Sequence, residues 1–291
     1  MELKTYIEKR QKLINSFLEK RMSRNGISRV DESMKYSLFA GGKRLRPLLL
    51  MATADVINGS GYRLRSVAAG LEMIHTYSLI HDDLPIMDDD DYRRGKPTNH
   101  KVYGEALALL AGDGLLTLAF EVMLEQKGVE PEKLIDVVRE VAMCAGNYGM
   151  VGGQTLDLDA ENKKINGDEL RTLHSAKTGA LFIAAVRSGA ILSGATDEEL
   201  LALTKFADLF GLAFQIKDDI LDFEGDSKLM GKPSGSDEKL HKSTYVSLYT
   251  LDGAKALLEK TIKEAETCLE IFGQNAEPLK KLTLYSLKRN S

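Results

Sequence analysis

One stretch of the chain, residues 81–95, concentrates side chains that could bind a metal ion and an anion together. Its sequence is HDDLPIMDDDDYRRG, in which six aspartates fall within ten residues and Arg93 and Arg94 follow at once. Carboxylates packed this closely repel one another, and a folded protein tolerates them when cations hold them together. Mg²⁺ and Mn²⁺ prefer hard oxygen ligands, and Mg²⁺ typically binds through a few carboxylates and substrate phosphates. Arginines beside such a site are typical phosphate clamps. The segment therefore predicts a metal–diphosphate site; the alternative is a solvated acidic loop.

A second acidic motif occurs in FQIKDDILD at 214–222, within a stretch of helical character. Asp218 and Asp222 are four residues apart and share one helix face with Gln215. Like charges at this spacing destabilise an isolated helix, and the apolar neighbours predict partial burial, which is costly for unpaired carboxylates. A bound Mg²⁺ is the economical explanation, and the alternative is a helix surface whose acids pair with neighbouring lysines.

The first acidic site requires a break in its helix. On an ideal helix Asp88 would lie about 240° around from Asp82 and point away from it. Pro85 lacks an N–H, and its ring clashes with the carbonyl four residues back. We therefore expect a helix through His75 to about Asp83, followed by a tight irregular turn that brings Asp88 back toward Asp82. His75 lies seven residues before Asp82 and shares its stripe on that helix.

Basic residues in loops or at helix ends complement the two acidic motifs. Any one of them alone is more often an ordinary surface residue. As a set they indicate two anionic groups bound at once, one through metal and one directly. The set comprises Lys43, Arg44, Arg46, Arg93, Arg94, Lys177, Lys232 and Lys242. The glycine-bearing segments 41–42 and 225–235 are candidate lids over such a site.

The bulk composition excludes several classes of function. The net charge of −4 argues against a nucleic-acid-binding protein, which usually carries a basic surface. Cys144 and Cys268 show no CxxC spacing, so they indicate neither a zinc site nor a disulfide framework, which fits a reducing cytosol. The N-terminal residues lack the signature of a signal peptide, and no run approaches the ~18 apolar residues that span a membrane. We expect a cytoplasmic protein with no nucleic-acid partner and no stable membrane insertion.

Leucine and alanine recur at three- and four-residue spacing in long stretches without proline, which predicts helices. The predicted helices cover 2–22, 67–80, 105–125, 131–146, 168–174, 179–192, 197–223 and 253–272. No alternating strand pattern, internal repeat or long linker divides the chain. The fold class is therefore predicted to be all-α, a large helical bundle forming a single domain over residues 1–291.

The order of these motifs resembles the trans-isoprenyl diphosphate synthases, and closely the farnesyl diphosphate synthases of bacterial type. Asp82-Asp83-x₄-Asp88 is similar to the first aspartate-rich motif of that family, and Asp218-Asp219-x-x-Asp222 is similar to the second. The segments at 42–47, 153–157, 177–179 and 231–245 also match. The resemblance covers nearly the whole chain and implies a bundle of the isoprenoid synthase type with a central cavity, acting as a homodimer.

The resemblance also implies residue roles. The ligands of Mg²⁺ (three ions per active site, with Mn²⁺ as an alternative) would be Asp82, Asp83, Asp88, Asp218 and Asp222. The contacts of the allylic diphosphate would be Arg93, Lys177 and Lys232, with Gln215 close by. The diphosphate of isopentenyl diphosphate would lie against Lys43, Arg46, His75 and Arg94. The groups nearest the chemistry would be Asp82, Lys177, Thr178, Gln215 and Asp218.

The implied reaction is the head-to-tail condensation of isopentenyl diphosphate with dimethylallyl and geranyl diphosphate, which gives (2E,6E)-farnesyl diphosphate. Loss of the allylic diphosphate creates a carbocation, and the released diphosphate is the implied base. The alternatives are a geranylgeranyl diphosphate synthase of the same family, a non-catalytic partner subunit, and a helical metal phosphohydrolase.

Product length would depend on Tyr77. This residue lies five before Asp82, about 7–8 Å along the helix, and an aromatic there in the resembled family corresponds to a stop at fifteen carbons. The alternative is that Tyr77 is simply a core aromatic.

Overall fold

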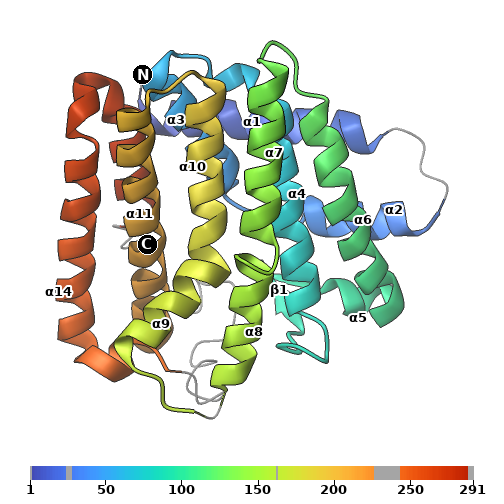
Figure 1. Cartoon of the computed structure of the whole chain (residues 1–291). Coiled ribbons are helices and arrows are strands. Elements are labelled where there is room, and N and C mark those ends of the chain that lie inside the picture. Colours follow the sequence, from blue (N-terminus) through green and yellow to red (C-terminus); the bar gives the residue numbers. More distant parts are fainter. Residues whose placement is uncertain (1, 24–27, 162, 226–242, 288–291) are drawn as a thin grey trace.

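The computed structural model describes residues 2–23, 28–161, 163–225 and 243–287, which form an assembly of helices (Figure 1). The helices are α1 (Leu3–Met22), α2 (Val30–Leu38), α3 (Leu45–Ile57), α4 (Arg65–Asp82), α5 (Asn99–Tyr103), α6 (Glu105–Leu124), α7 (Pro131–Ala145), α8 (Met150–Ala160), α9 (Gly167–His174), α10 (Ala180–Leu192), α11 (Asp197–Glu224), α14 (Tyr245–Cys268) and α15 (Glu277–Leu287). Short 3₁₀ segments lie at Gly61–Arg63 and Glu270–Ala276, and a π-helical turn joins α9 to α10 at Ser175–Gly179. The all-α prediction is confirmed.

The eight predicted helices are present with small shifts at their ends, except the last. The helix predicted for 253–272 begins earlier, at Tyr245, ends at Cys268, and contains a backbone break at Thr250. Five helices of the described residues were missed: α2, α3, α5, α8 and α15. A two-stranded hairpin of β1 (Tyr92–Arg93) and β2 (Lys96–Pro97) also follows the acidic segment, and its strands are too short to show alternation.

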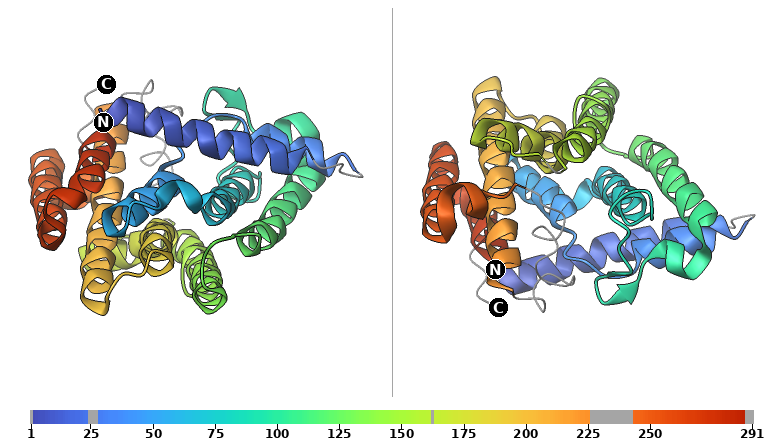
Figure 2. Two further views of the ribbon diagram at one scale, coloured as in Figure 1. Left: turned by 90° about the horizontal axis from the view of Figure 1, so that it is seen from above. Right: turned by 90° about the horizontal axis from the view of Figure 1, so that it is seen from below.

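Helices α3 and α4 form the inside of the bundle, surrounded by α1, α6, α7, α10 and α11 (Figure 2). Helix α4 packs along α6, and α10 packs against α3, α7 and α11. The central position of α3 explains why it was missed. Its sequence LRPLLLMATADVI is buried on nearly all sides, so it has no polar face from which a helical period could be recognised.

Helix α6 corrects the expectation that no segment is apolar enough to span a membrane. By length and composition Glu105–Leu124 is such a helix, with a mean hydropathy of 1.8 over a window of 18 residues that is 39% buried. Within the bundle α6 packs along α4 and against α2, and buries Ala111 and Leu115. Leu109 and Leu110 face outward. Helix α6 therefore belongs to the bundle, and its outward side exposes these leucines together with Asp113 and Glu121.

Candidate active site

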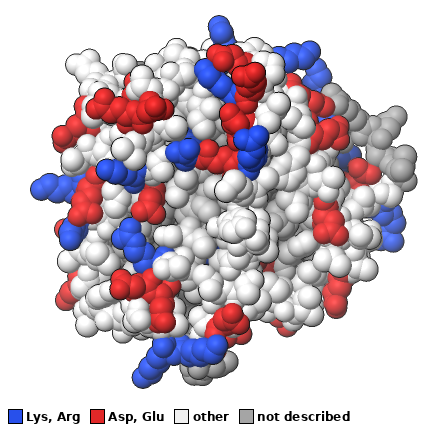
Figure 3. Space-filling model, in the orientation of Figure 1, with Lys and Arg blue, Asp and Glu red and all other residues white. Residues whose placement is uncertain are grey.

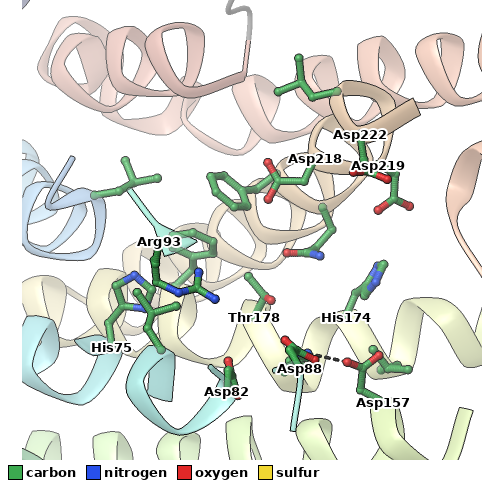
Figure 4. Close-up of a pocket in the computed structure, with 18 of the residues that line it drawn as sticks. His75, Asp82, Asp88, Arg93, Asp157, His174, Thr178, Asp218, Asp219 and Asp222 are labelled. Carbon is green, nitrogen blue, oxygen red and sulfur yellow. Dashed lines mark hydrogen bonds and ion pairs between the residues drawn. The ribbon is translucent and has the colours of Figure 1, made fainter. Parts of the chain in front are cut away.

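A pocket of about 1050 Å³ opens among α3, α4, α8, α11 and the π-turn, and both acidic motifs line it (Figure 4). The predicted site residues that line it are Lys43, Arg44, Arg46, His75, Asp82, Asp88, Arg93, Arg94, Lys177, Thr178, Gln215, Asp218 and Asp222. Lys232, Lys242 and nearly all of the candidate lid at 225–235 lie outside the described residues. The sequence had assigned no role to four other lining residues, Glu72, Asp157, His174 and Asp219.

Helix α4 ends at Asp82, and the chain then turns back on itself. The backbone N–H of Asp88 donates to the carbonyl of Asp82 at 2.9 Å, and that of Asp89 donates to Leu84 at 3.2 Å. Asp89 adopts a left-handed conformation with φ 50°, which aspartate tolerates better than most residues. The predicted helix end and tight turn are confirmed, and they place Asp88 beside Asp82.

The carboxyl of Asp82 has an unusual pKa. Burial is the main cause and raises the pKa, Lys177 lowers it, Asp88 raises it, and the net pKa is about 6. A cation bound beside Asp82 would favour its ionised form and lower this pKa again. The chemistry of the donor set therefore fits a divalent ion that prefers oxygen ligands.

The opposite wall of the pocket is α11, on which Asp218 and Asp222 face Asp82 and Asp88 (Figure 4). Asp222 is buried, which excludes a fully solvated acidic face. Asp219 differs from its neighbours because its Oδ2 accepts the backbone N–H of Tyr245 at 2.6 Å. It therefore anchors the start of α14, and the two outer aspartates of the motif remain as the candidate metal ligands.

The two acidic walls do not form a complete metal site on their own. Across the described ranges, no three His, Cys, Asp or Glu side chains gather closely enough to hold an ion. Mg²⁺ commonly keeps several waters and binds through one or two carboxylates plus substrate phosphates. Two facing pairs of aspartates suit that mode, in which a diphosphate between the walls supplies the remaining oxygens.

The cations near the acidic walls are held by carboxylates. Arg93 Nε donates to both oxygens of Asp83, at 2.7 and 2.9 Å, and its Nη2 lies 3.3 Å from Asp90. Asp83 is buried in this ion pair and does not line the pocket, so its assignment as a metal ligand stays a prediction. Lys177 Nζ pairs with Asp157 Oδ2 at 2.5 Å. Both cations are thus positioned before any anion binds.

Lys177 and Thr178 sit on the π-turn between α9 and α10. A π-turn inserts an extra residue into a helix and is frequent at functional sites. Two glycines allow neighbouring helices to approach it. A Cβ on Gly153 of α8 would lie 2.1 Å from the backbone nitrogen of Lys177, and one on Gly211 of α11 would lie 3.0 Å from Gly179 Cα. The turn is therefore held between α8 and α11 by direct backbone packing.

A second group of cations lies at the other side of the pocket. The guanidinium of Arg46 is 4.6 Å from the centroid of the Phe182 ring, and burial lowers the pKa of Arg46 to about 10. Burial, followed by the positive charges of Arg46 and Arg94, lowers the pKa of His75 well below its usual value. Arg94 donates to the carbonyl of Gly41. These cations suit an anion that enters the pocket without a metal.

Arg44 departs from the predicted anion-binding set. It begins α3 in a left-handed conformation with φ 54°, which directs its side chain into the bundle. There it donates to Glu72 Oε1 at 2.8 Å, to the carbonyl of Leu38 at 2.7 Å and to Asn15 Oδ1 at 3.0 Å. Its guanidinium is therefore committed to internal partners.

Tyr77 is buried in the core around α4, and its ring meets His81 edge-on at a centroid distance of 5.5 Å. It does not belong to the lining of the pocket described above. Its role as a floor for the growing chain stays a prediction.

The chain belongs to the polyprenyl synthetase family, whose sequence model matches residues 27–277. It is 52% identical over 237 residues to the farnesyl diphosphate synthase of Bacillus subtilis, covering 81% of this chain and 80% of the relative. It is 42% identical to the geranylgeranyl diphosphate synthase of Cyanophora paradoxa, covering 99% of this chain and 97% of that one. The crystal structure of an FPP/GFPP synthase from Zymomonas mobilis superimposes with a TM-score of 0.88 at 37% identity, covering 97% of this chain and 98% of the other. The chain is therefore a trans-prenyltransferase, and the resemblance inferred from its motifs is confirmed.

Proposed function

We propose that the protein is a farnesyl diphosphate synthase, which joins isopentenyl diphosphate first to dimethylallyl diphosphate and then to geranyl diphosphate. The observation that carries the proposal is the single pocket in which two facing aspartate pairs lie beside a separate cluster of cations. Such a pocket can hold two diphosphates at once, one through metal and one directly. Identity to the Bacillus enzyme supports the fifteen-carbon product. The similar identity to geranylgeranyl diphosphate synthases keeps the twenty-carbon product as the second candidate.

In this proposal Asp82, Asp88, Asp218 and Asp222 hold Mg²⁺, with Asp83 in support and Mn²⁺ as an alternative ion. The ions, when bound, supply positive charge that stabilises the leaving diphosphate. Arg93, Lys177 and Lys232 bind the oxygens of the same group, and their charges act where negative charge develops. Thr178 and Gln215 line the space beside the reacting carbon.

The second cluster orients the nucleophile. Lys43, Arg46, His75 and Arg94 bind the diphosphate of isopentenyl diphosphate and hold its double bond close to the allylic carbon. The allylic C–O bond breaks with its electron pair leaving on the diphosphate, and the double bond forms the new C–C bond. A proton is then lost to the released diphosphate. The chain itself supplies binding, orientation and exclusion of water.

We also propose that residues 1–291 act as one domain and that two copies form a homodimer through the outward face of α6. The uncharged area in the middle of the face that carries α7 supports an interface on this side, since charged side chains gather mostly toward its edges (Figure 3). We propose a cytoplasmic location by analogy with the bacterial relatives. A relative from Catharanthus roseus is chloroplastic, so the relatives do not all share one compartment.

The test is a product analysis with the purified chain. We expect isopentenyl diphosphate with either dimethylallyl or geranyl diphosphate and Mg²⁺ to give a fifteen-carbon diphosphate, and EDTA to abolish turnover. A twenty-carbon product would favour the second candidate. Absence of any condensation with Mg²⁺ or Mn²⁺ would instead favour the non-catalytic subunit.

A further inference from the structure

Glu72 is a buried carboxylate in the wall of the cationic pocket, and the proposed chemistry gives it no part. It lies on α4, is 1% exposed, and lines the pocket together with Arg46 and Arg94. Its Oε1 accepts from Arg44 at 2.8 Å. Its Oε2 has no hydrogen-bond partner among the residues that the structure describes. A buried charge with one unsatisfied oxygen is costly and therefore calls for an explanation.

The need to hold Arg44 in place does not by itself explain why a charged Glu72 is buried here. Arg44 also donates to Asn15 and to the carbonyl of Leu38, so two further partners fix its direction. The charge of Glu72 extends beyond this pair, because it favours the charged forms of both Arg46 and Arg94 and raises the pKa of each against the effect of burial. Glu72 is thus an internal counter-charge to the cations that would bind a diphosphate.

We propose that Glu72 is a positioning residue that limits how tightly this pocket holds a diphosphate, so that the group can leave after each condensation. This inference rests on the proposed function. The allylic diphosphate is the leaving group, so the product keeps the diphosphate that entered with isopentenyl diphosphate. That group ends each condensation among Lys43, Arg46 and Arg94, and must leave them before the product can react again or be released.

Burial strengthens the effect of the Glu72 charge on a bound diphosphate. An anion close to the bound diphosphate repels it, and this repulsion is stronger in a buried site than in water. Without Glu72 the cations would face the diphosphate with no internal competitor, and Arg44 would add its own unbalanced charge. The pocket would then bind more tightly and release more slowly.

The direct test measures the binding of inorganic diphosphate by calorimetry in EDTA, which removes any metal-dependent binding. We expect Glu72→Gln to bind about three- to tenfold more tightly than the unchanged protein. Glu72→Asp keeps the charge and should bind like the unchanged protein. Asn15→Ala is the matched control, since it loosens Arg44 by removing one of its acceptors but changes no charge, and it should leave the affinity unaltered. Arg46→Gln should weaken binding, which locates the probe in this pocket.

Equal or weaker binding by Glu72→Gln, with an unchanged circular dichroism spectrum, would overturn the proposal. So would an equal gain in Asn15→Ala, because the release of Arg44 would then be the cause. If Glu72→Gln does not fold, Glu72→Met carries the same test without the charge. In turnover, KM for isopentenyl diphosphate and kcat should both fall in Glu72→Gln, whereas a purely structural defect would raise KM. Should the chain fail to condense any prenyl substrate, the proposed function fails and the calorimetry still decides the effect of the charge.

Discussion

In this pocket, side chains of the same type make different contacts, depending on the position and conformation of their backbone. Asp218 and Asp222 face the cavity from one helix stripe, while Asp219 between them binds the start of α14. Helical periodicity predicts that division. Arg44 and Arg46 also make different contacts. Here the cause is the left-handed conformation of Arg44, which a sequence motif does not reveal.

The neutral state of His75 leads to a prediction about stability. Its pKa in the folded protein is lowered, whereas in the unfolded chain it should lie near the usual value of about 6.5. The unfolded chain therefore binds a proton that the folded protein does not, and stability falls as pH drops below about 6.5. We expect His75→Gln to lose about 1 kcal/mol less stability than the unchanged protein between pH 7.5 and 5.5. Urea unfolding at both pH values measures this, and identical losses in the two proteins would contradict it.

Tyr77 carries the prediction about product length. If its ring closes the path of the growing chain, Tyr77→Ala should give products longer than fifteen carbons. Removing a buried aromatic also costs about 3–5 kcal/mol, so the assay is run well below the melting temperature. Chromatography of the dephosphorylated products decides the matter, with Tyr62→Ala at an exposed position as the control. An unchanged product would leave Tyr77 as a core aromatic only.

Among the elements, the π-turn depends most on its neighbours. Because Gly153 lies against the backbone of Lys177, we expect Gly153→Ala to push the turn away from α8 and displace Lys177 and Thr178. The kcat should fall at least about tenfold, since small misplacements of positioning groups are costly. KM for isopentenyl diphosphate should change little, because Arg46 and His75 lie on other elements. Val151→Ala on the same helix is the control, and steady-state kinetics of both variants test the prediction. Loss of substrate binding with normal kcat would be inconsistent with it.

The break in α14 stores backbone strain. Thr250 has φ 64° and ψ 166°, a region that is almost restricted to glycine and costs about 1–3 kcal/mol for other residues. Its hydroxyl accepts the N–H of Gly253 at 3.3 Å, which recovers only part of that cost. We expect Thr250→Gly to stabilise the protein by about 1 kcal/mol. Thr267→Gly, near the C-terminal end of the same helix, should give no such gain, because glycine has a lower helix propensity than threonine. Thermal unfolding compares the two, and a lower melting temperature for Thr250→Gly would count against strain.

At the scale of the whole molecule, one buried stripe made α7 predictable from the sequence, whereas α3 is apolar throughout and α8 contains two adjacent glycines. The acidic walls and their meeting in one pocket follow from residue types, spacing and Pro85. The carboxylates that hold the cations could not be predicted in this way. Asp157 pairs with Lys177 and Glu72 pairs with Arg44, and each pair joins segments that are separated in the chain.

Exposed apolar side chains on α6 and α7 bear on the assembly of two chains. Helix α6 exposes Leu109 and Leu110 on the side opposite its buried alanines, and α7 beside it exposes Ile135 and Met143. Exposed apolar residues gathered on neighbouring helices are typical of an interface. We expect the protein to sediment with about twice the 32.1 kDa mass of one chain, and Leu110→Glu to shift it to the monomer because a buried unpaired carboxylate is costly in an interface. Leu201→Glu, at an exposed position on α11, should leave the dimer intact. If the unchanged protein is a monomer, the dimer is excluded. If the dimer tolerates Leu110→Glu, the contact between the two chains lies elsewhere.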